Sequence, residues 1–231
     1  MHQELDFIDV PVISAAFRQL GIFVLDGSGS MTDPVQPAGG GSKSRPKCQE
    51  VSISVRELLT RFKVSRKAPN FSFGLVTFND SVTFEGPVTA LVDIDDNGNY
   101  DPTASGVGGT FIGSGLEAAG RMAKGFLADT SSGLPSSVVI LTMSDGECAK
   151  PDVTASIADG LKADPNISIA AAFFATKGGG SSAGHALLQE ICSDPATMYK
   201  TVYDAETLRK FFEASMTAAA SMAGIETDSQ R

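Results

Sequence analysis

Short apolar runs alternate with longer amphipathic stretches along this chain. Four of the runs are almost continuously apolar, which is the pattern of strands buried on both faces of a parallel sheet. These runs cover residues 21–25, 71–78, 137–143 and 167–174. A weaker strand pattern follows at 199–202, and the turn "NDS" predicts that residues 82–84 pair back onto 71–78 as a hairpin.

The stretches between the apolar runs carry apolar residues at helical spacing. Helices are therefore expected over residues 51–62, 111–127, 153–161, 186–192 and 204–222, the last with Asp204 as its N-cap. Strands that alternate with helices in this way indicate an α/β protein of the doubly wound type. We expect a mostly parallel sheet with one antiparallel hairpin strand and with helices on both faces.

The same pattern predicts one domain without internal repeats. We assign this domain to residues 20–222, preceded by an extension over 1–19 and followed by a flexible tail over 223–231. Two polar loops, 33–47 and 86–109, are unusually long for connections between a strand and a helix. They elaborate the single domain and do not separate two domains.

Composition narrows the classes of partner. The chain of 231 residues has 42% hydrophobic and 19% charged residues, an ordinary globular balance, and its net charge is −9. An acidic chain disfavours nucleic acid and anionic membranes as partners, and no apolar run reaches the length of a membrane span. Three widely spaced cysteines without a CxxC pair, and a start without a signal-peptide pattern, predict reduced thiols in a cytoplasmic protein.

Candidate chemistry gathers where two of the predicted strands end. In "IFVLDGSGSM", the apolar run ends on Asp26, and Ser28 and Ser30 follow at alternate positions. Asp145 follows the run 137–143 in the same way. Ligands of doubly wound sheets bind outside the carboxyl ends of strands, at the point where the strand order reverses. Two carboxylates with several hydroxyls and no nitrogen or sulfur are a ligand set for a hard divalent cation, and a water or an outside group would complete its shell.

The sequence "DGSGS" resembles the DxSxS motif of the von Willebrand factor A family, whose members hold a metal ion at an adhesion site. Two further elements of that family occur in its order: Thr110 in "GVGGTFIGSG" and Asp145 in "LTMSDGE". The resemblance spans about residues 20–220 and implies a Rossmann-like domain. It also implies that Ser28, Ser30 and Thr110 bind the metal through their hydroxyls, and that Asp26 and Asp145 bind it directly or through water.

The resemblance implies Mg²⁺ as the metal, with Mn²⁺ or Ca²⁺ as alternatives, and a partner protein that binds it through an acidic residue. We expect both long loops to border this metal face. The family also implies a last helix that shifts when the metal binds a ligand. It allows a partner such as an AAA+ ATPase or a stress-response complex of the tellurite-resistance type.

A second metal loop is a weaker expectation. Asp93, Asp95, Asn97 and Asp101 match positions 1, 3, 5 and 9 of an EF-hand loop, but Ala104 stands at position 12, where a glutamate is needed. The alternative is a solvated turn.

Enzymatic alternatives are less well supported by the residues. A metal-assisted hydrolase or phosphoryl-transfer enzyme needs a general base near the metal, and only Glu147 or Asp33 is at hand. The motif "GSSAG" resembles a nucleophile elbow around Ser182, but His185 lies too close in sequence to act as its base. We therefore expect a protein-binding module and no enzyme.

Overall fold

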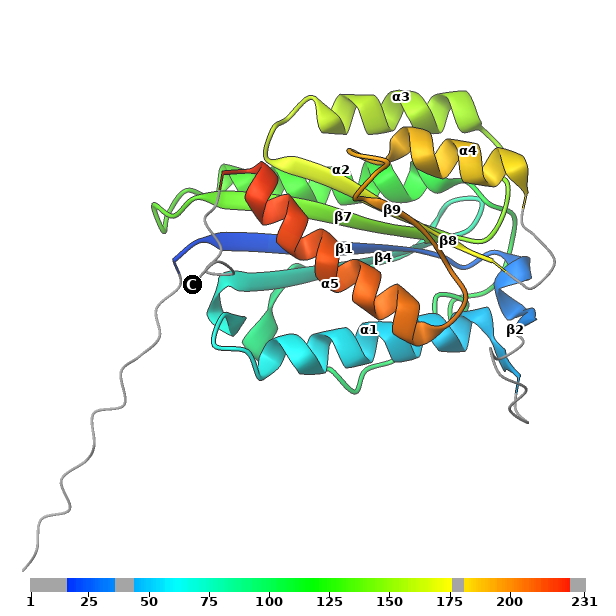
Figure 1. Ribbon diagram of the computed structural model, residues 1–231, viewed down its shortest axis with the longest axis horizontal. Coiled ribbons are helices and arrows are strands. Elements are labelled where there is room, and N and C mark those ends of the chain that lie inside the picture. Colours follow the sequence, from blue (N-terminus) through cyan, green and yellow to red (C-terminus); the bar gives the residue numbers. More distant parts are fainter. Residues whose placement is uncertain (1–15, 36–43, 176–180, 225–231) are drawn as a thin grey trace, which may run out of the picture.

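The computed structural model describes residues 16–35, 44–175 and 181–224. The predicted extension over 1–19 and tail over 223–231 lie almost entirely outside these residues. A seven-stranded sheet runs in the order β5-β4-β1-β7-β8-β9, with β6 also paired to β4 (Figure 1). Its strands are β1 (Arg18–Asp26), β4 (Phe71–Phe78), β5 (Val82–Glu85), β6 (Thr89–Ala90), β7 (Ser136–Ser144), β8 (Ile167–Phe174) and β9 (Tyr199–Val202).

Strand β1 lies at the centre of the sheet, between β4 and β7, and is parallel to both. The chain passes from β1 to β4 on one side and later to β7 on the other, so the strand order reverses between β1 and β7. The predicted hairpin is confirmed, because β5 pairs antiparallel to β4. The short strand β6 also pairs antiparallel to β4, and the sequence pattern did not predict it.

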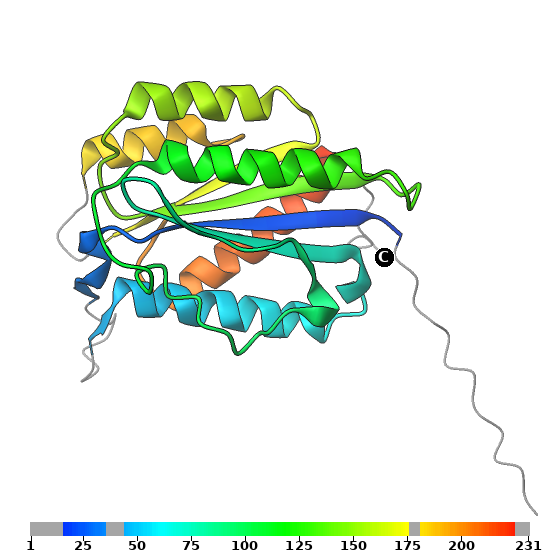
Figure 2. The same cartoon turned by 180° about the vertical axis from the view of Figure 1, so that it is seen from behind.

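Five helices of the described chain cover both faces of the sheet, as expected. They are α1 (Lys47–Lys63), α2 (Ile112–Ala128), α3 (Pro151–Lys162), α4 (Ser182–Ile191) and α5 (Ala205–Met222). Helices α1 and α5 pack together on one face, whereas α2, α3 and α4 form the layer on the other (Figures 1 and 2). Helix α1 begins before the apolar periodicity that predicted it, with Lys47 as its first residue.

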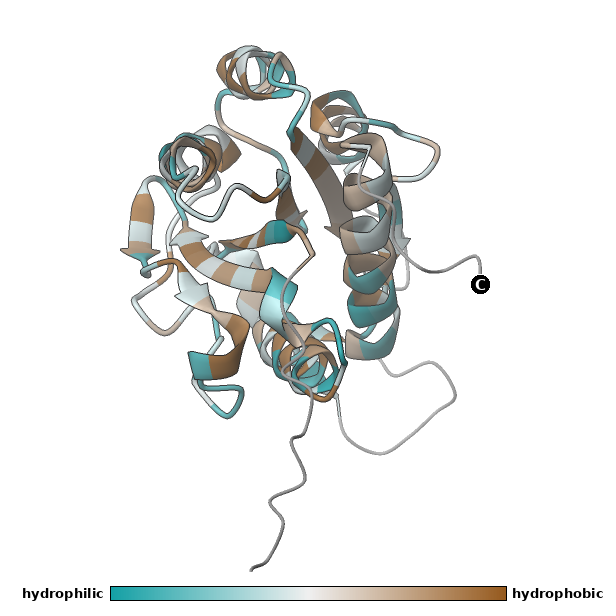
Figure 3. Cartoon of the chain, turned by 90° about the vertical axis from the view of Figure 1, so that its left-hand side faces the viewer, coloured by the Kyte–Doolittle hydropathy of each residue, from teal (hydrophilic) through white to brown (hydrophobic). Residues whose placement is uncertain are grey.

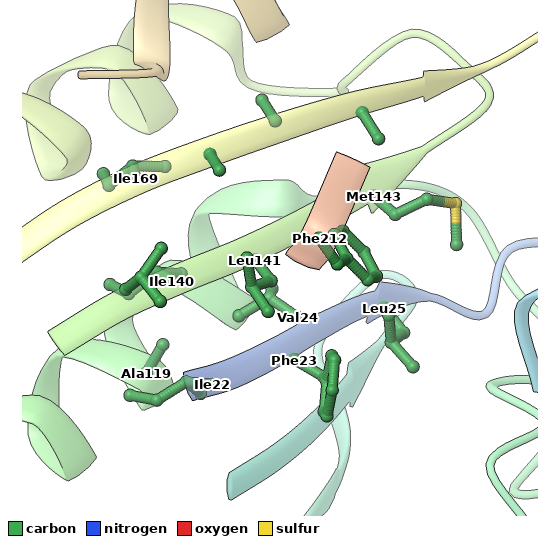
Figure 4. Packing of buried hydrophobic residues seen from close by; sticks show 14 of the residues in the cluster. Ile22, Phe23, Val24, Leu25, Ala119, Ile140, Leu141, Met143, Ile169 and Phe212 are labelled. Carbon is green, nitrogen blue, oxygen red and sulfur yellow. The ribbon is translucent and has the colours of Figure 1, made fainter. Parts of the chain in front are cut away.

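The hydrophobic core consists of two layers because successive side chains of a strand point to opposite faces. On one face, a Cβ at Gly115 of α2 would lie 2.7 Å from Val24. On the other, the ring centroid of Phe23 lies 5.4 Å from that of Phe73 and 5.8 Å from that of Phe212 in α5. Figure 4 labels Phe23 and Phe212. An end-on view shows largely hydrophobic strands between the helices (Figure 3). The continuously apolar runs of the sequence therefore reflect burial on both faces.

The two ends of the first long loop are joined by a short pair of strands, which we call the clasp. Strands β2 (Pro34–Val35) and β3 (Arg45–Pro46) pair antiparallel, and residues 36–43 between them lie outside the described residues. The Lys47 N–H donates to the Asp33 carbonyl over 3.1 Å, and the Ser44 hydroxyl donates to the Val35 carbonyl over 2.6 Å. The clasp fixes both ends of the loop beside the carboxyl edge of the sheet.

The second long loop reaches that edge with its second half, in which the Pro102 carbonyl oxygen would lie 2.4 Å from a Cβ at Gly27. The Gly108 carbonyl accepts a hydrogen bond of 3.0 Å from the Gly29 N–H, which places residues 108–110 at the carboxyl edge of the sheet. Asp96, by contrast, accepts hydrogen bonds from Thr60 and Lys63 in the last turns of α1. The expectation that both loops border the metal face therefore holds for 33–47 and only in part for 86–109. No described helix combines the length and the hydropathy needed to cross a membrane.

Candidate metal centre

All five predicted ligands lie at the carboxyl edge of the sheet. Asp26 is the last residue of β1, and Asp145 directly follows β7. Because these two strands are parallel neighbours, their last residues emerge side by side. Ser28 and Ser30 belong to the turn after β1, which continues into a 3-10 helix, η1 (Gly29–Thr32). Thr110 precedes the first turn of α2.

The serine hydroxyls connect these segments. The Ser28 and Ser30 hydroxyl oxygens lie 3.1 Å apart, and the Ser30 hydroxyl donates to Oδ1 of Asp145 over 2.7 Å. Two oxygens that bind one ion at about 2.1 Å and at right angles are about 3.0 Å apart. Both spacings are hydrogen-bond distances, and they also lie close to the edge length of a Mg²⁺ octahedron.

Thr110 faces the same space. A Cβ atom placed on Gly146 would lie 3.9 Å from Oγ1 of Thr110 and 3.9 Å from Oγ of Ser30, so both hydroxyls border one point. The Thr110 backbone is held on both sides. Its carbonyl accepts from the Ala149 N–H over 2.8 Å, and the next N–H, of Phe111, donates to the Asn79 carbonyl over 2.8 Å.

Glycine at position 27 lets the turn pass close to a neighbouring loop. The Gly27 N–H donates to the Phe78 carbonyl over 2.7 Å, and a Cβ at this position would lie 2.4 Å from the Pro102 carbonyl oxygen. That separation is far below van der Waals contact with a backbone atom, so a larger residue would displace the turn. Gly27 thus allows Ser28 and Ser30 to reach the site.

Asp26 is fully buried, with no exposed surface. Its Oδ1 accepts from the Ser28 N–H over 2.7 Å, and its Oδ2 accepts from the Ser144 hydroxyl over 2.5 Å. Burial raises the pKa of this carboxyl to about 6, a shift that these hydrogen bonds oppose and that the charge of Asp145 adds to. A positive charge nearby would favour the ionised form.

Lys47 brings such a charge to the site from the first turn of α1. Its side chain is 6% exposed, and its ammonium forms a short ion pair with Oδ2 of Asp145. The same ammonium donates to the Ser30 carbonyl over 3.2 Å and lies 3.9 Å from Oδ2 of Asp33. Both oxygens of Asp145 are thus in use, one by the Ser30 hydroxyl and one by Lys47.

The donor set fits a hard divalent cation. It offers only oxygen atoms, from two carboxylates and three hydroxyls, and three of these oxygens already have the spacing of neighbouring ligands. The number of side chains is below the usual six or more ligands, which leaves room for water or an outside group. The site differs from the expected set in one respect, namely the ammonium of Lys47.

Sequence reasoning missed three residues that shape the site. The sequence pattern places Lys47 at the end of a loop, Ser144 after an apolar run and Asp80 in a hairpin turn. In the fold, Oδ2 of Asp80 accepts from the Gly109 N–H over 2.9 Å and thereby holds the segment that carries Thr110. Of these three residues, only Ser144 could have been found from the sequence. In "MSDGE" its hydroxyl stands beside Asp145 at the strand end, where it can donate to a second carboxylate.

The second predicted metal loop is not assembled as a site. Among the described residues, no three His, Cys, Asp or Glu side chains are grouped so that they could hold a metal ion. Oδ1 of Asp95 accepts from the Asn97 N–H over 2.9 Å, and Oδ1 of Asp101 accepts from the N–H and hydroxyl of Thr103. Asp93 is exposed. These hydrogen bonds fit a solvated turn, and metal binding by this loop stays a prediction.

The candidate enzymatic groups have other partners. Oε1 of Glu147 accepts from the Ser181 hydroxyl over 2.5 Å, and Asp33 lies beside Lys47. The predicted elbow serine, Ser182, is the first residue of α4. The ring of His185 stacks on Phe173 and its Nδ1 bonds with the Tyr199 hydroxyl.

Comparisons with known proteins identify the family and the fold. The sequence model of the von Willebrand factor type A domain matches residues 22–214. No curated protein sequence matches the chain. The pilus adhesin SpaC from Lactobacillus rhamnosus GG has a similar structure, with 14% identity and a TM-score of 0.66 over 91% of this chain. The match covers 31% of SpaC, so the chain spans about a third of that protein.

Two further solved structures share the fold. The vWF domain of the type V pili tip protein Mfa5 from Porphyromonas gingivalis is 10% identical, with a TM-score of 0.63 over 94% of this chain and 99% of that one. The minor pilin PilB from Streptococcus sanguinis is 15% identical, with a TM-score of 0.62 over 94% of this chain and 64% of that one. At such identities, the likeness concerns the fold.

Proposed function

Since this chain belongs to the von Willebrand factor type A domain family, we propose that it is a metal-dependent protein-interaction module. A divalent cation at the carboxyl edge of the sheet would engage an acidic side chain of a partner protein. The observation that carries this proposal is the cluster of oxygen atoms from Ser28, Ser30 and Asp145, with spacings of 3.1 and 2.7 Å.

The residues of the chain have distinct roles in this proposal. Ser28, Ser30 and Thr110 bind through their hydroxyls, and Asp26 and Asp145 bind directly or through water. When bound, Mg²⁺, or alternatively Mn²⁺ or Ca²⁺, supplies an open position for a carboxylate oxygen of the partner. The buried hydrogen bonds from Ser144 and the Ser28 N–H keep the Asp26 carboxylate oriented toward the turn.

The comparisons support an interaction module in general terms. The neighbours named above include a pilus adhesin, a pilus tip protein and a minor pilin, and this chain shares their fold. None of them identifies a partner for this chain. An AAA+ ATPase or a stress-response complex stays a prediction, as does a cytoplasmic location.

No observation favours the hydrolase alternative. A general base must reach the reacting group, directly or through one water. Glu147 is bonded to Ser181, and Asp33 lies beside the Lys47 ammonium. The proposal therefore assigns no catalytic residue.

Calorimetric titration with MgCl₂ and MnCl₂ tests the metal centre. Ser30→Ala and Thr110→Ala each remove one hydroxyl ligand, and each should weaken the affinity for the metal by about tenfold or more. Ser132→Ala is a matched control, since Ser132 is an exposed serine in the turn before β7. Equal affinities in all four proteins would contradict the assigned ligands.

Selection of displayed random peptides on the immobilised chain tests the partner chemistry. In Mg²⁺, we expect the recovered peptides to share an Asp or Glu, and we expect EDTA to release them. Peptides that bind equally well in EDTA, or that lack a common acidic residue, would count against an acidic partner.

A further inference from the structure

The ammonium of Lys47 lies among the proposed metal ligands. Lys47 is 4% exposed, and its charge is paired with the Asp145 carboxylate, whose side chain is fully covered. The other neighbours of the ammonium are the Ser30 carbonyl at 3.2 Å and the Asp33 carboxylate at 3.9 Å. A buried charge needs such partners.

The place of Lys47 in its helix gives a second observation. Lys47 is the first residue of α1, where the helix dipole disfavours a positive charge. The ion pair with Asp145 must therefore offset both desolvation and the dipole. A lysine that only supported the fold would be better placed at the carboxyl end of the helix, as Lys63 is.

A divalent cation at this site and this ammonium would share one carboxylate, that of Asp145, through its two different oxygens. Of the two Asp145 oxygens, Lys47 uses Oδ2, and the Ser30 hydroxyl uses Oδ1. A doubly charged ion bound to Asp145 and Ser30 would lie within a few ångströms of the ammonium. Their repulsion is strong in a site from which water is largely excluded.

We propose that Lys47 is a built-in counter-cation of this metal centre, which neutralises Asp145 until a divalent ion displaces it. Lys47 thereby lowers the affinity of the site for divalent cations and sets the metal concentration at which it fills. This inference rests on the proposed metal-binding function and adds the residue that tunes it.

The test compares Lys47→Met with the wild-type chain by calorimetric titration of MgCl₂ and MnCl₂. Methionine keeps an unbranched side chain of similar length and removes the charge. The affinity for each metal should become tighter by at least about tenfold, because the metal no longer has to displace a cation.

Lys63→Met is the matched control. Lys63 is the last residue of the same helix and forms an ion pair of 3.0 Å with Asp96, on the other side of the molecule from the metal edge. This variant loses a lysine and an ion pair, but its affinity for the metals should be that of the wild-type chain.

A second measurement uses the wild-type chain and so does not depend on the folding of a variant. Reductive methylation read by mass spectrometry reports the access of reagent to each lysine. Lys47 should be protected in EDTA and become reactive in saturating MgCl₂, whereas the reactivity of Lys63 should not change.

The possible outcomes distinguish a failure of this inference from a failure of the function on which it rests. If the wild-type chain binds metal but Lys47→Met binds it no more tightly, and Lys47 stays protected in MgCl₂, the counter-cation role is wrong and the metal centre stands. If only Lys47→Met binds metal, the counter-cation role is supported in its strongest form. If neither protein binds metal, both the inference and the proposed function fail.

Discussion

Burial determines the chemistry of single residues in this chain, and the cysteines illustrate this. All three, Cys48, Cys148 and Cys192, are free thiols. Cys192 is 3% exposed, and burial raises the pKa of its thiol to about 11. Burial also raises the pKa of Cys48. Only Cys148 is partly exposed.

Alkylation should therefore proceed in a definite order. At pH 8 a thiol with a pKa of about 11 is ionised in about one molecule in a thousand, and only the thiolate reacts. Iodoacetamide should modify Cys148 first and Cys192 far more slowly, with the rate at Cys192 rising as the pH approaches 11. Mass spectrometry after timed quenching measures both rates.

The control for this prediction is the chain unfolded in urea, in which the three thiols should react at similar rates. Equal rates at Cys148 and Cys192 in the folded chain would show that the thiol of Cys192 is not protected by burial and that its pKa is not raised.

Residues at strand ends were predictable from the sequence, whereas their buried partners were not. Asp26 and Asp145 each end an apolar run, and this local pattern specifies a position at the edge of a sheet. Lys47 and Asp80 act on the site through contacts that join distant segments. Nothing in the neighbouring sequence distinguishes such a lysine or aspartate from an ordinary solvated one, so that only the fold reveals them.

At the scale of elements, the strands were predicted more closely than the helix starts. The predicted ranges 71–78, 167–174 and 199–202 coincide with β4, β8 and β9. Helices α1 and α4 both begin earlier than the apolar periodicity, and of these two only α4 has a side chain that caps its first turn. In α4, the Ser181 hydroxyl accepts from the Gly184 N–H over 3.2 Å.

The cap of α5 gives a test at this scale. The predicted N-cap is confirmed, since Oδ1 of Asp204 accepts from the Thr207 N–H over 2.8 Å. Asp204→Ala should lower the free energy of unfolding by about 1 kcal/mol, because it leaves a backbone N–H of the first turn without this partner. Urea unfolding followed by circular dichroism measures the change.

Asp204→Asn is the matched variant for the same experiment. Its amide oxygen can accept the same hydrogen bond, so most of the stability should be retained. An equal loss in both variants would assign the effect to the charge of Asp204 and not to the cap.

For the whole molecule, the proposed metal binding would be coupled to folding stability. The proposed ligands come from three segments that only the folded sheet brings together, so a metal bound there should stabilise the folded state alone. At a free Mg²⁺ concentration about one hundred times the dissociation constant, the gain is about 2.7 kcal/mol. For a chain of this size, that corresponds to a rise of about 5–10 °C in the thermal midpoint.

Differential scanning calorimetry in EDTA and in MgCl₂ measures this rise, and Thr110→Ala should abolish most of it. A thermal midpoint that does not respond to saturating Mg²⁺ would mean that the metal does not bind the folded centre.

The clasp of β2 and β3 has a consequence for how this domain can diversify. Because Pro34 pairs with Pro46, and the Lys47 N–H bonds to the Asp33 carbonyl, the two ends of the enclosed segment meet beside the metal edge. Residues 36–43 can therefore be lengthened, shortened or exchanged without a shift of Ser30 or Lys47. A foreign peptide grafted between Val35 and Ser44 should therefore leave the proposed metal ligands in place.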